Sequence, residues 1–356
     1  MQALLVARLG RCLASLGMFA LGVILVSRAQ AANHLRLYVS DEDSGEIAVI
    51  DPEAGQVLQR IGVGKRPRGI KLARDGKLLY VALSGSPAAG PGVDESKLPP
   101  PDRPADGIGV VDLTTHKLLR TLPGGQDPEA FDLSPDGKTI YVSNEETAEV
   151  TVLDLPTGKI RGKVAVGKEP EGVTVRPDGR FVYVTCEGDS EVVAIEAVTV
   201  KVVSHMQTKL RPRSIVFTKD GFTAFVTAER SAAVTVLDGI RHETVDTINI
   251  PSESEKSPPA RPMGSVLSPD GTRVFVSTGR GESIAVIDVA TRKLVRIIGN
   301  VGARPWGIGV SADGRTIYTA NGSSDDVSVL DVETGRIERR IKVGGRPWGL
   351  VVASSQ

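Results

Sequence analysis

The sequence is poor in cysteine, histidine and aromatic residues. Its 356 residues include two cysteines, four histidines and 4% aromatic side chains. Cys12 lies in an amino-terminal apolar stretch, so Cys186 has no intramolecular partner once that stretch is removed. This excludes a disulfide scaffold, and the chain also lacks a Cys-x-x-Cys-His motif for covalent haem. With so few histidines, we expect no haem, copper or other metal centre.

An excess of charge of one sign is also missing. The 43 basic residues equal the 43 acidic ones, and removal of residues 1–31 takes away three arginines, which leaves 40 basic residues and a formal charge of −3. Such a balance provides no broad attraction for nucleic acid or for an anionic membrane surface.

The amino terminus carries a short apolar run. The run extends from Cys12 to Val26, follows Arg8 and Arg11, and precedes Ala-Gln-Ala at residues 29–31, a small-x-small cleavage pattern. This order predicts a secretory signal peptide over residues 1–31. The alternative is a retained anchor, but the run falls short of the roughly 20 residues that cross a bilayer. We expect a periplasmic or secreted protein in which residues 32–356 form one domain.

Asp-Gly pairs recur along the rest of the chain, mostly at intervals of about 42 residues. Their aspartates are Asp75, Asp136, Asp178, Asp220, Asp270 and Asp313. Within each interval, alternating apolar and polar runs are separated by Asp-Gly, Thr-Gly and Val-Gly turns, which predicts four short antiparallel strands. One such unit cannot bury both of its faces, whereas a closed ring of units can. The period therefore predicts an all-β protein with a β-propeller fold.

A proline begins the predicted first strand of each unit. The seven prolines predict seven blades: Pro67, Pro128, Pro170, Pro212, Pro262, Pro305 and Pro347. The seventh is followed by one strand only, at residues 348–353, while three further strands are predicted before the first proline, at residues 36–40, 46–51 and 56–61. We therefore expect the carboxy-terminal strand to pair with the three amino-terminal strands and close the ring.

Several repeats resemble a known family. LYVS, IYVSNEETAEVTVLD, VYVTCEGDSEVVAIE and IYTANGSSDDVSVLD are similar to the YVTN repeats of exported bacterial seven-bladed β-propellers, over residues 35–353. Within that family, QDPEAFDLSPDG, KEPEGVTVRPDG and the final RPWG resemble propellers associated with PQQ-dependent alcohol catabolism. The chain departs from this subgroup in a Pro-rich insert. The resemblance implies the fold, and PQQ as a cofactor is implied by resemblance alone.

The segments around the seven prolines are expected to ring one mouth of the central channel, because each innermost strand begins there. Arginine and tryptophan beside a concavity suit an anionic or aromatic ligand. The alternative is that the charges pair across the mouth and the indoles fill the channel. No nucleophile or metal motif accompanies the carboxylates, so no catalytic residue is assigned. The candidate ligand-binding residues are Arg66, Arg68, Glu129, Glu171, Arg213, Arg304, Trp306, Arg346 and Trp348.

Two insertions are predicted on the same face. Residues 84–106 interrupt the loop after the second strand of the first blade, and residues 251–260 precede the innermost strand of the fifth. A long loop without periodicity is either a functional lid or a mobile flap. The loops after other second strands add Glu145, Glu187, Glu229 and Asn321.

These features favour a non-catalytic binding protein that holds a small anionic or aromatic ligand, or a protein segment, at the mouth. We expect it to be a monomer. If the finer resemblance holds, its setting is quinone-linked oxidation. One alternative is a single-stranded nucleic-acid-binding propeller that uses Trp306 and Trp348 as stacking platforms. A second is a lactonase-like or quinone-dependent enzyme, for which the sequence contains no evident cofactor motif.

Overall fold

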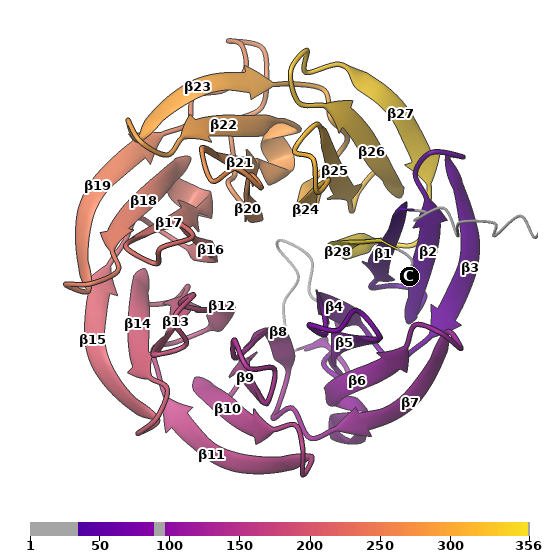
Figure 1. Ribbon diagram of the computed structural model, residues 1–356, viewed down its shortest axis with the longest axis vertical. Coiled ribbons are helices and arrows are strands. Elements are labelled where there is room, and N and C mark those ends of the chain that lie inside the picture. The colour runs from indigo at the N-terminus through magenta and orange to yellow at the C-terminus, as the bar shows by residue number, and fades with distance from the viewer. Residues whose placement is uncertain (1–34, 89–96, 355–356) are drawn as a thin grey trace, which may run out of the picture. The chain divides into compact units, whose positions relative to one another are not determined.

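The fold is a ring of seven four-stranded antiparallel sheets arranged around a central axis (Figure 1). The computed structural model describes residues 35–88 and 97–354; the predicted signal peptide and residues 89–96 of the first insert lie outside them. The seven-bladed all-β fold predicted from the repeats is therefore confirmed. No helix of the described residues is long and apolar enough to cross a membrane.

The first three blades, from the innermost strand outward, consist of β4 (Pro67–Leu72), β5 (Leu78–Leu83), β6 (Gly107–Asp112) and β7 (Lys117–Leu122); β8 (Pro128–Leu133), β9 (Thr139–Asn144), β10 (Glu149–Asp154) and β11 (Lys159–Ala165); and β12 (Pro170–Val175), β13 (Phe181–Cys186), β14 (Glu191–Glu196) and β15 (Lys201–Gln207).

The next three blades consist of β16 (Pro212–Phe217), β17 (Thr223–Ala228), β18 (Ala233–Asp238) and β19 (Glu243–Asn249); β20 (Ser265–Leu267), β21 (Arg273–Ser277), β22 (Ile284–Asp288) and β23 (Lys293–Ile298); and β24 (Pro305–Val310), β25 (Thr316–Asn321), β26 (Asp326–Asp331) and β27 (Ile337–Lys342). Short 3-10 helices occur at η2 (Arg103–Ala105), η3 (Glu229–Ser231) and η4 (Gly279–Gly281).

The seventh blade joins the two ends of the described chain. It contains β28 (Pro347–Ser354), followed outward by β1 (Leu35–Asp41), β2 (Glu46–Asp51) and β3 (Gln56–Gly62). β28 and β1 are antiparallel, with Leu37 opposite Val352 and Val39 opposite Leu350 (Figure 1). The predicted closure is confirmed, and the second Arg-Pro-Trp-Gly sequence leads into the innermost strand of this composite blade.

Among the described residues, seven apolar clusters stabilise the ring, and each lies between two adjacent blades. One cluster joins Leu37 and Val39 of the seventh blade to Tyr318 and Val327 of the sixth. Because successive side chains of a strand point to opposite faces, each blade contributes to two clusters. No blade is buried without its neighbours, so closure of the ring is required to cover every face.

The fifth blade differs from its prediction. Six innermost strands begin at the expected proline, but β20 begins at Ser265 rather than at Pro262. The N–H groups of Arg261 and Met263 still donate to the carbonyls of Thr278 and Ser277, at 2.9 and 2.8 Å. The ladder between β20 and β21 begins only at Ser265, which lies opposite Val276, so Pro262 precedes the regular pairing.

The Asp-Gly turns lie at the opposite end of the blades from the prolines. In the second blade, the hydroxyl of Ser134 and the backbone N–H of Lys138 donate to the Asp136 carboxylate at 2.5 and 3.0 Å. Gly137 adopts φ 69°, which favours glycine at that position. These hydrogen bonds lower the pKa of Asp136, so each turn satisfies its own charge locally.

Candidate functional site

The mouth of the channel is formed by the residue after each innermost-strand proline. A serine or threonine of the preceding blade holds the backbone of five of these residues by donating to their carbonyl oxygen. The pairs are Ser40 with Arg68 (2.7 Å), Ser143 with Glu171 (2.6 Å), Thr185 with Arg213 (2.9 Å), Thr227 with Met263 (2.6 Å) and Ser277 with Trp306 (2.8 Å).

A glycine follows most of these mouth residues and gives the next blade room to approach. A Cβ on Gly172 would lie 2.1 Å from the carbonyl oxygen of Arg213, and one on Gly307 would lie 2.5 Å from that of Trp348. Gly69, Gly264 and Gly349 are placed in the same way against the following blade. Where it occurs, the Pro-x-Gly sequence therefore helps to fix the direction of the mouth side chain through contacts between blades.

The residues before the prolines have an unusual backbone. Arg66, Asp127, Glu169, Arg211 and Arg304 all have positive φ, between 40° and 61°. This region is uncommon for residues other than glycine. Such strain persists where surrounding contacts hold it, and it gathers at functional sites.

One side of the mouth is a buried cluster of acids around two arginines. The Arg213 guanidinium pairs with Glu171 and Glu229, each at 3.0 Å, and with Glu187. Arg211 lies 2.5 Å from Glu187 and 3.3 Å from Glu229. Three carboxylates thus surround two guanidinium groups. Burial, followed by the charge of Glu171, raises the pKa of Glu187 to about 8, because the excess negative charge is costly away from water.

A second acidic group adjoins the first. Asp127, Glu129 and Glu145 bring carboxylate oxygens within 4.8 Å of one another, close enough to hold a cation. Arg68 pairs with Glu129 and Arg66 lies 3.8 Å from Asp127, so two of the carboxylates already have a positive partner. We assign no metal to this group. Burial, with the charge of Glu171, raises the pKa of Glu145 to about 7.

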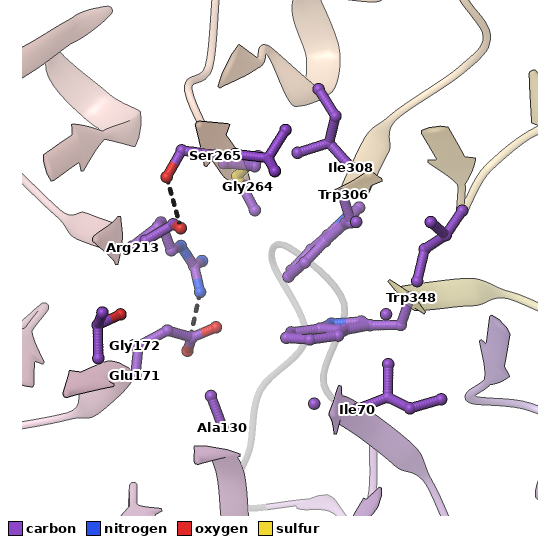
Figure 2. Close-up of a pocket in the computed structure, with 18 of the residues that line it drawn as sticks. Ile70, Ala130, Glu171, Gly172, Arg213, Gly264, Ser265, Trp306, Ile308 and Trp348 are labelled. Carbon is purple, nitrogen blue, oxygen red and sulfur yellow. Dashed lines mark hydrogen bonds and ion pairs between the residues drawn. The ribbon is translucent and has the colours of Figure 1, made fainter. Parts of the chain in front are cut away.

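The two tryptophans lie on the opposite side of the channel from Arg213 and Glu171 (Figure 2). The ring centroids of Trp306 and Trp348 are 5.3 Å apart, with 41° between the planes. The Arg68 guanidinium lies 5.3 Å from the Trp348 ring, and those of Arg304 and Arg213 lie 5.0 and 5.5 Å from the Trp306 ring. These distances suit cation–π contacts.

Two cavities meet at the indole pair. The larger, of about 320 Å³, is the central channel, where Trp306 and Trp348 face Arg213 and Glu171 between glycine backbone and aliphatic side chains (Figure 2). The smaller, of about 60 Å³, is lined by four arginines with the same two tryptophans and Glu42. We call it the arginine pocket; its arginines are Arg66, Arg68, Arg304 and Arg346.

The structure therefore brings the nine predicted site residues together around one mouth. Six of them line the arginine pocket, four line the channel, and the two tryptophans belong to both. Glu129 is fully buried beneath them and pairs with Arg68. Many of the charges pair across the mouth, as the alternative reading expected, and yet a cavity remains beside the indoles.

The first insert is attached to the mouth at both of its ends. The Arg66 guanidinium donates to the carbonyl of Ser86 at 2.6 Å, and Lys65 lies 2.7 Å from Asp102. Arg103 pairs with Glu146 of the second blade. The described parts of the insert thus contact the first two blades, and Ala88 reaches the arginine pocket.

Sequence reasoning missed Glu42, which follows β1 and pairs with Arg66 (3.2 Å), Arg68 (3.8 Å) and Arg346 (3.4 Å). Although burial acts in the opposite direction, the charges of these arginines lower the pKa of Glu42. The signal was present, because Glu145, Glu187 and Glu229 also directly follow a second strand. This pattern was overlooked at Glu42 because the strands of the seventh blade come from both ends of the chain.

The remaining chemistry-bearing residues lie away from the mouth or have structural partners. Cys186 is fully buried, and burial raises its thiol pKa to about 12, which suits a core residue. His205 pairs with Glu191 at 2.9 Å, and His242 lies 2.6 Å from the Tyr183 hydroxyl. The Asn321 side chain donates to Val301, Asp326 and Ser328 and so caps its own turn.

Comparisons with known proteins agree with this architecture. Residues 172–347 match the family model described as lactonase, 7-bladed beta-propeller, and residues 93–177 match the YNCE-like beta-propeller model. Antigen Lp49 of Leptospira interrogans is 29% identical over 119 residues, which are 31% of this chain. The match covers 23% of Lp49, so the chain spans about a quarter of that relative's length.

Two solved structures share the fold. A functionally unknown protein from Desulfotomaculum acetoxidans gives a TM-score of 0.74 at 12% identity, over 90% of this chain and 99% of that one. A candidate 6-phosphogluconolactonase from Bacteroides fragilis gives 0.71 at 18% identity, over 92% and 99%. The sheet order and these solved structures identify the chain as a seven-bladed β-propeller, and parts of its sequence are similar to the lactonase and YNCE-like propeller models.

Proposed function

We propose that this protein is an exported, non-catalytic binding propeller that holds a small anionic ligand at the mouth. One observation carries the proposal: the arginine pocket places four guanidinium groups and two indoles around a small cavity, and Glu42 is the carboxylate among its described lining residues. Guanidinium groups bind carboxylates and phosphates in paired hydrogen bonds, and indole faces favour planar or cationic neighbours.

Arg304 gives the pocket its unbalanced charge. The ion pairs of the mouth, among the described residues, use Arg66, Arg68 and Arg346 but not Arg304. Burial, together with the charge of the nearby Arg280, lowers the pKa of Arg304, which marks a site of high positive potential. An anion bound there would gain more than it would on an exposed surface.

Intrinsic tryptophan fluorescence tests the proposal, because both tryptophans of the chain lie at the mouth. We expect a saturable change with simple organic anions or with PQQ, a planar polycarboxylate that would fit a role beside quinone-linked oxidation. Arg304→Gln should weaken binding at least about tenfold, whereas Arg315→Gln, at an exposed Asp-Gly turn, should not. Unchanged binding in Arg304→Gln would contradict the proposal.

Single-stranded DNA belongs in the same titration as the competing ligand class. Binding that is tight at low salt and falls steeply with added salt would favour a nucleic-acid function. We expect none, because Arg213 is already paired with Glu171, Glu187 and Glu229, and residues 32–356 carry a formal charge of −3, so the channel offers a phosphate backbone little net attraction.

A second candidate function is lactone hydrolysis, favoured by one specific observation. Glu145 has a pKa near 7 and stands at the mouth, which is the protonation behaviour that a general base needs at neutral pH. Arg213 is positioned in the same mouth to stabilise developing negative charge. Proton release from δ-lactones, followed at constant pH, tests this reading. Activity that is lost in Glu145→Gln, in a protein that remains folded, would replace the binding proposal.

The cellular location is a separate proposal. The first 31 residues carry the order of a secretory signal, and an exported binding protein would need one. Fractionation of cells that express the full chain should recover it in the periplasm or medium, with an amino terminus near residue 32. Recovery of the uncut chain in the membrane fraction would instead indicate an anchored protein.

A further inference from the structure

The two cavities of the mouth differ in chemistry although they share a wall. Trp306 and Trp348 line both. On one side of the indoles lies the arginine pocket, with a volume of about 60 Å³. On the other lies the channel, about 320 Å³, whose walls include Ile70, Ile308 and Leu350. A polar compartment and a largely apolar one are therefore adjacent.

The arginine pocket matches one anionic group. Glu42 is the carboxylate among its described lining residues and is shared by Arg66, Arg68 and Arg346. These three arginines also pair with Asp127, Glu129 and Asp43, so Arg304 is the guanidinium that has no ion pair among the described residues. Its volume is small, so the pocket suits a headgroup rather than a whole organic ligand. A carboxylate, phosphate or sulfate would meet this description, because each accepts several hydrogen bonds from guanidinium nitrogens.

The channel matches an apolar body. Its volume lies at the lower end of the range for small-molecule sites, and a bare inorganic ion in the arginine pocket would leave it unused. Ala130 and Ile308 line it together with the two indoles (Figure 2). Hydrocarbon placed there would be removed from water, which favours binding in proportion to the area buried.

The charges of the two compartments set the direction of such a ligand. Glu171 and Arg213 line the channel opposite the indoles and pair with each other at 3.0 Å (Figure 2). Arg213 also pairs with Glu187 and Glu229, and Lys71, which lines the channel too, pairs with Asp132, so the positive charges of the channel wall are already matched. Arg304 in the arginine pocket forms no ion pair among the described residues and would attract an anionic headgroup. The charge distribution therefore favours one orientation.

We propose that the mouth binds an amphipathic organic anion, with its headgroup in the arginine pocket and its apolar body in the channel against Trp306 and Trp348. This inference rests on the proposed anion-binding function and adds the ligand class. The headgroup could belong to a fatty or aromatic carboxylate or to an alkyl phosphate, since these share the chemistry that the arginines recognise.

A homologous series tests the apolar half. Acetate, butyrate, hexanoate and octanoate differ only in methylene groups, and none of them fluoresces. We expect affinity, measured by tryptophan fluorescence and by calorimetry, to rise by up to about fourfold for each methylene buried. Equal affinities across the series would overturn the amphipathic inference while leaving anion binding intact. Silence of every anion in both measurements would overturn the proposed function as well.

The headgroup is tested at constant chain length. Octanol should bind at least about tenfold more weakly than octanoate, and equal binding would show that the arginines play no part. Octyl phosphate bound more tightly than octanoate would identify phosphate as the preferred headgroup, and the reverse order would identify carboxylate; either order agrees with the inference.

Two variants separate the compartments. Arg304→Gln should weaken octanoate about tenfold and leave octanol unchanged, with Arg315→Gln as the matched control. Ala130→Leu should fill part of the channel, so the gain from hexanoate to octanoate should disappear while acetate binding is kept. Thermal melts establish that both variants fold. An unchanged chain-length profile in folded Ala130→Leu would contradict placement of the body in the channel.

Discussion

The two faces of the propeller are built from the same repeats but treat their charges differently. At the turn face, each aspartate accepts hydrogen bonds from residues two or three positions away, as Ser268 and Thr272 do for Asp270. At the mouth, Arg213 of the fourth blade pairs with Glu171 and Glu187 of the third blade as well as with Glu229 of its own blade. The comparison teaches that charges on one face are satisfied within a turn, whereas those on the other depend on contacts between blades.

Backbone conformation around the prolines differs from that at the Asp-Gly turns. Positive φ at the Asp-Gly turns belongs to glycines such as Gly137 and Gly314. At the mouth it belongs to charged residues, including Asp127 and Arg304, which directly precede prolines. A glycine adopts this conformation at little cost, but an arginine before proline does so only when its surroundings hold it there. Positive φ also occurs at His116 and His242, in turns between third and fourth strands, so what is particular to the mouth is a charged residue with positive φ before a proline.

Removal of the closing strand should have the largest effect on stability, because the contacts between blades at the mouth require an intact ring. Deletion of residues 347–356 removes β28, Trp348 and the inner partner of β1. We expect loss of the cooperative thermal transition, measured by circular dichroism, since β1 loses its inner partner and two apolar clusters lose the residues that β28 contributes, Leu350 and Val352 in one and Val351 and Ala353 in the other. Deletion of residues 355 and 356 alone is the control and should be neutral. A stable, folded truncation would show that the ring does not need closure.

Substitution of single glycines should have the next largest effect, and the loss of stability should differ between the two faces. Gly172→Ala places a Cβ 2.1 Å from the Arg213 carbonyl, so the blades must move apart, and we expect a loss of about 3 kcal/mol or more. Gly314→Ala at a turn meets its nearest atom at 3.5 Å, and its positive φ should cost about 1 kcal/mol. Urea unfolding measures both. Equal losses would remove the contrast in how tightly the two faces are packed.

The two faces should also respond oppositely to pH. Hydrogen bonds from Ser268 and Thr272 lower the pKa of Asp270 to about 2, so its stabilisation is present above the ordinary aspartate pKa and is lost as pH falls toward 2. Burial and Glu171 raise the pKa of Glu187 to about 8 and of Glu145 to about 7, so their contribution is full below the ordinary glutamate pKa and is lost as pH rises through 7 to 8.

The melting temperature, measured between pH 2 and pH 9, should therefore decrease at both ends of this range. Glu187→Gln should flatten the alkaline side by about 1 kcal/mol or more, and Asp270→Asn should reduce only the acid side. A Glu187→Gln protein with an unchanged alkaline limb would show that the mouth acids are not strained by burial.

Shortening the first insert should have the smallest effect on stability. Replacement of residues 87–101 with two glycines keeps Gly85 close to Asp102, whose N–H donates to the Gly85 carbonyl at 2.9 Å. Loop length itself costs little, so the melting temperature should change by only a few degrees. An insoluble product would show that this segment supports the mouth, as the turn face needs no comparable loop.

The fold was accessible from sequence because its signals are local and repeated. The predicted seventh blade agrees with β1, β2 and β3 to within one residue, since alternation and turn chemistry act over a few neighbours. The exception is β20, where regular pairing depends on the neighbouring strand as well as on Pro262. The sequence around Pro262 does not show where regular pairing with the next strand begins.

The candidate site was only partly accessible. The seven prolines placed the mouth residues on one face, and the two tryptophans stood out by their rarity. Glu42 was missed because it belongs to the split blade, and the Ser40 hydroxyl that holds the Arg68 backbone is distant from it in sequence. Such contacts join residues of different blades, so the sequence of one repeat does not predict them.

The sequence by itself determined the number of blades, the strands within them and the way in which the ring closes. These follow from a period, a turn residue and the need to bury two faces of every sheet. Tertiary structure decided which charges meet, that Arg213 is surrounded by acids, and that two cavities share the indoles of Trp306 and Trp348. The physical reason is that charge pairing and cavity shape depend on distances across the ring, which its curvature and inter-blade packing set.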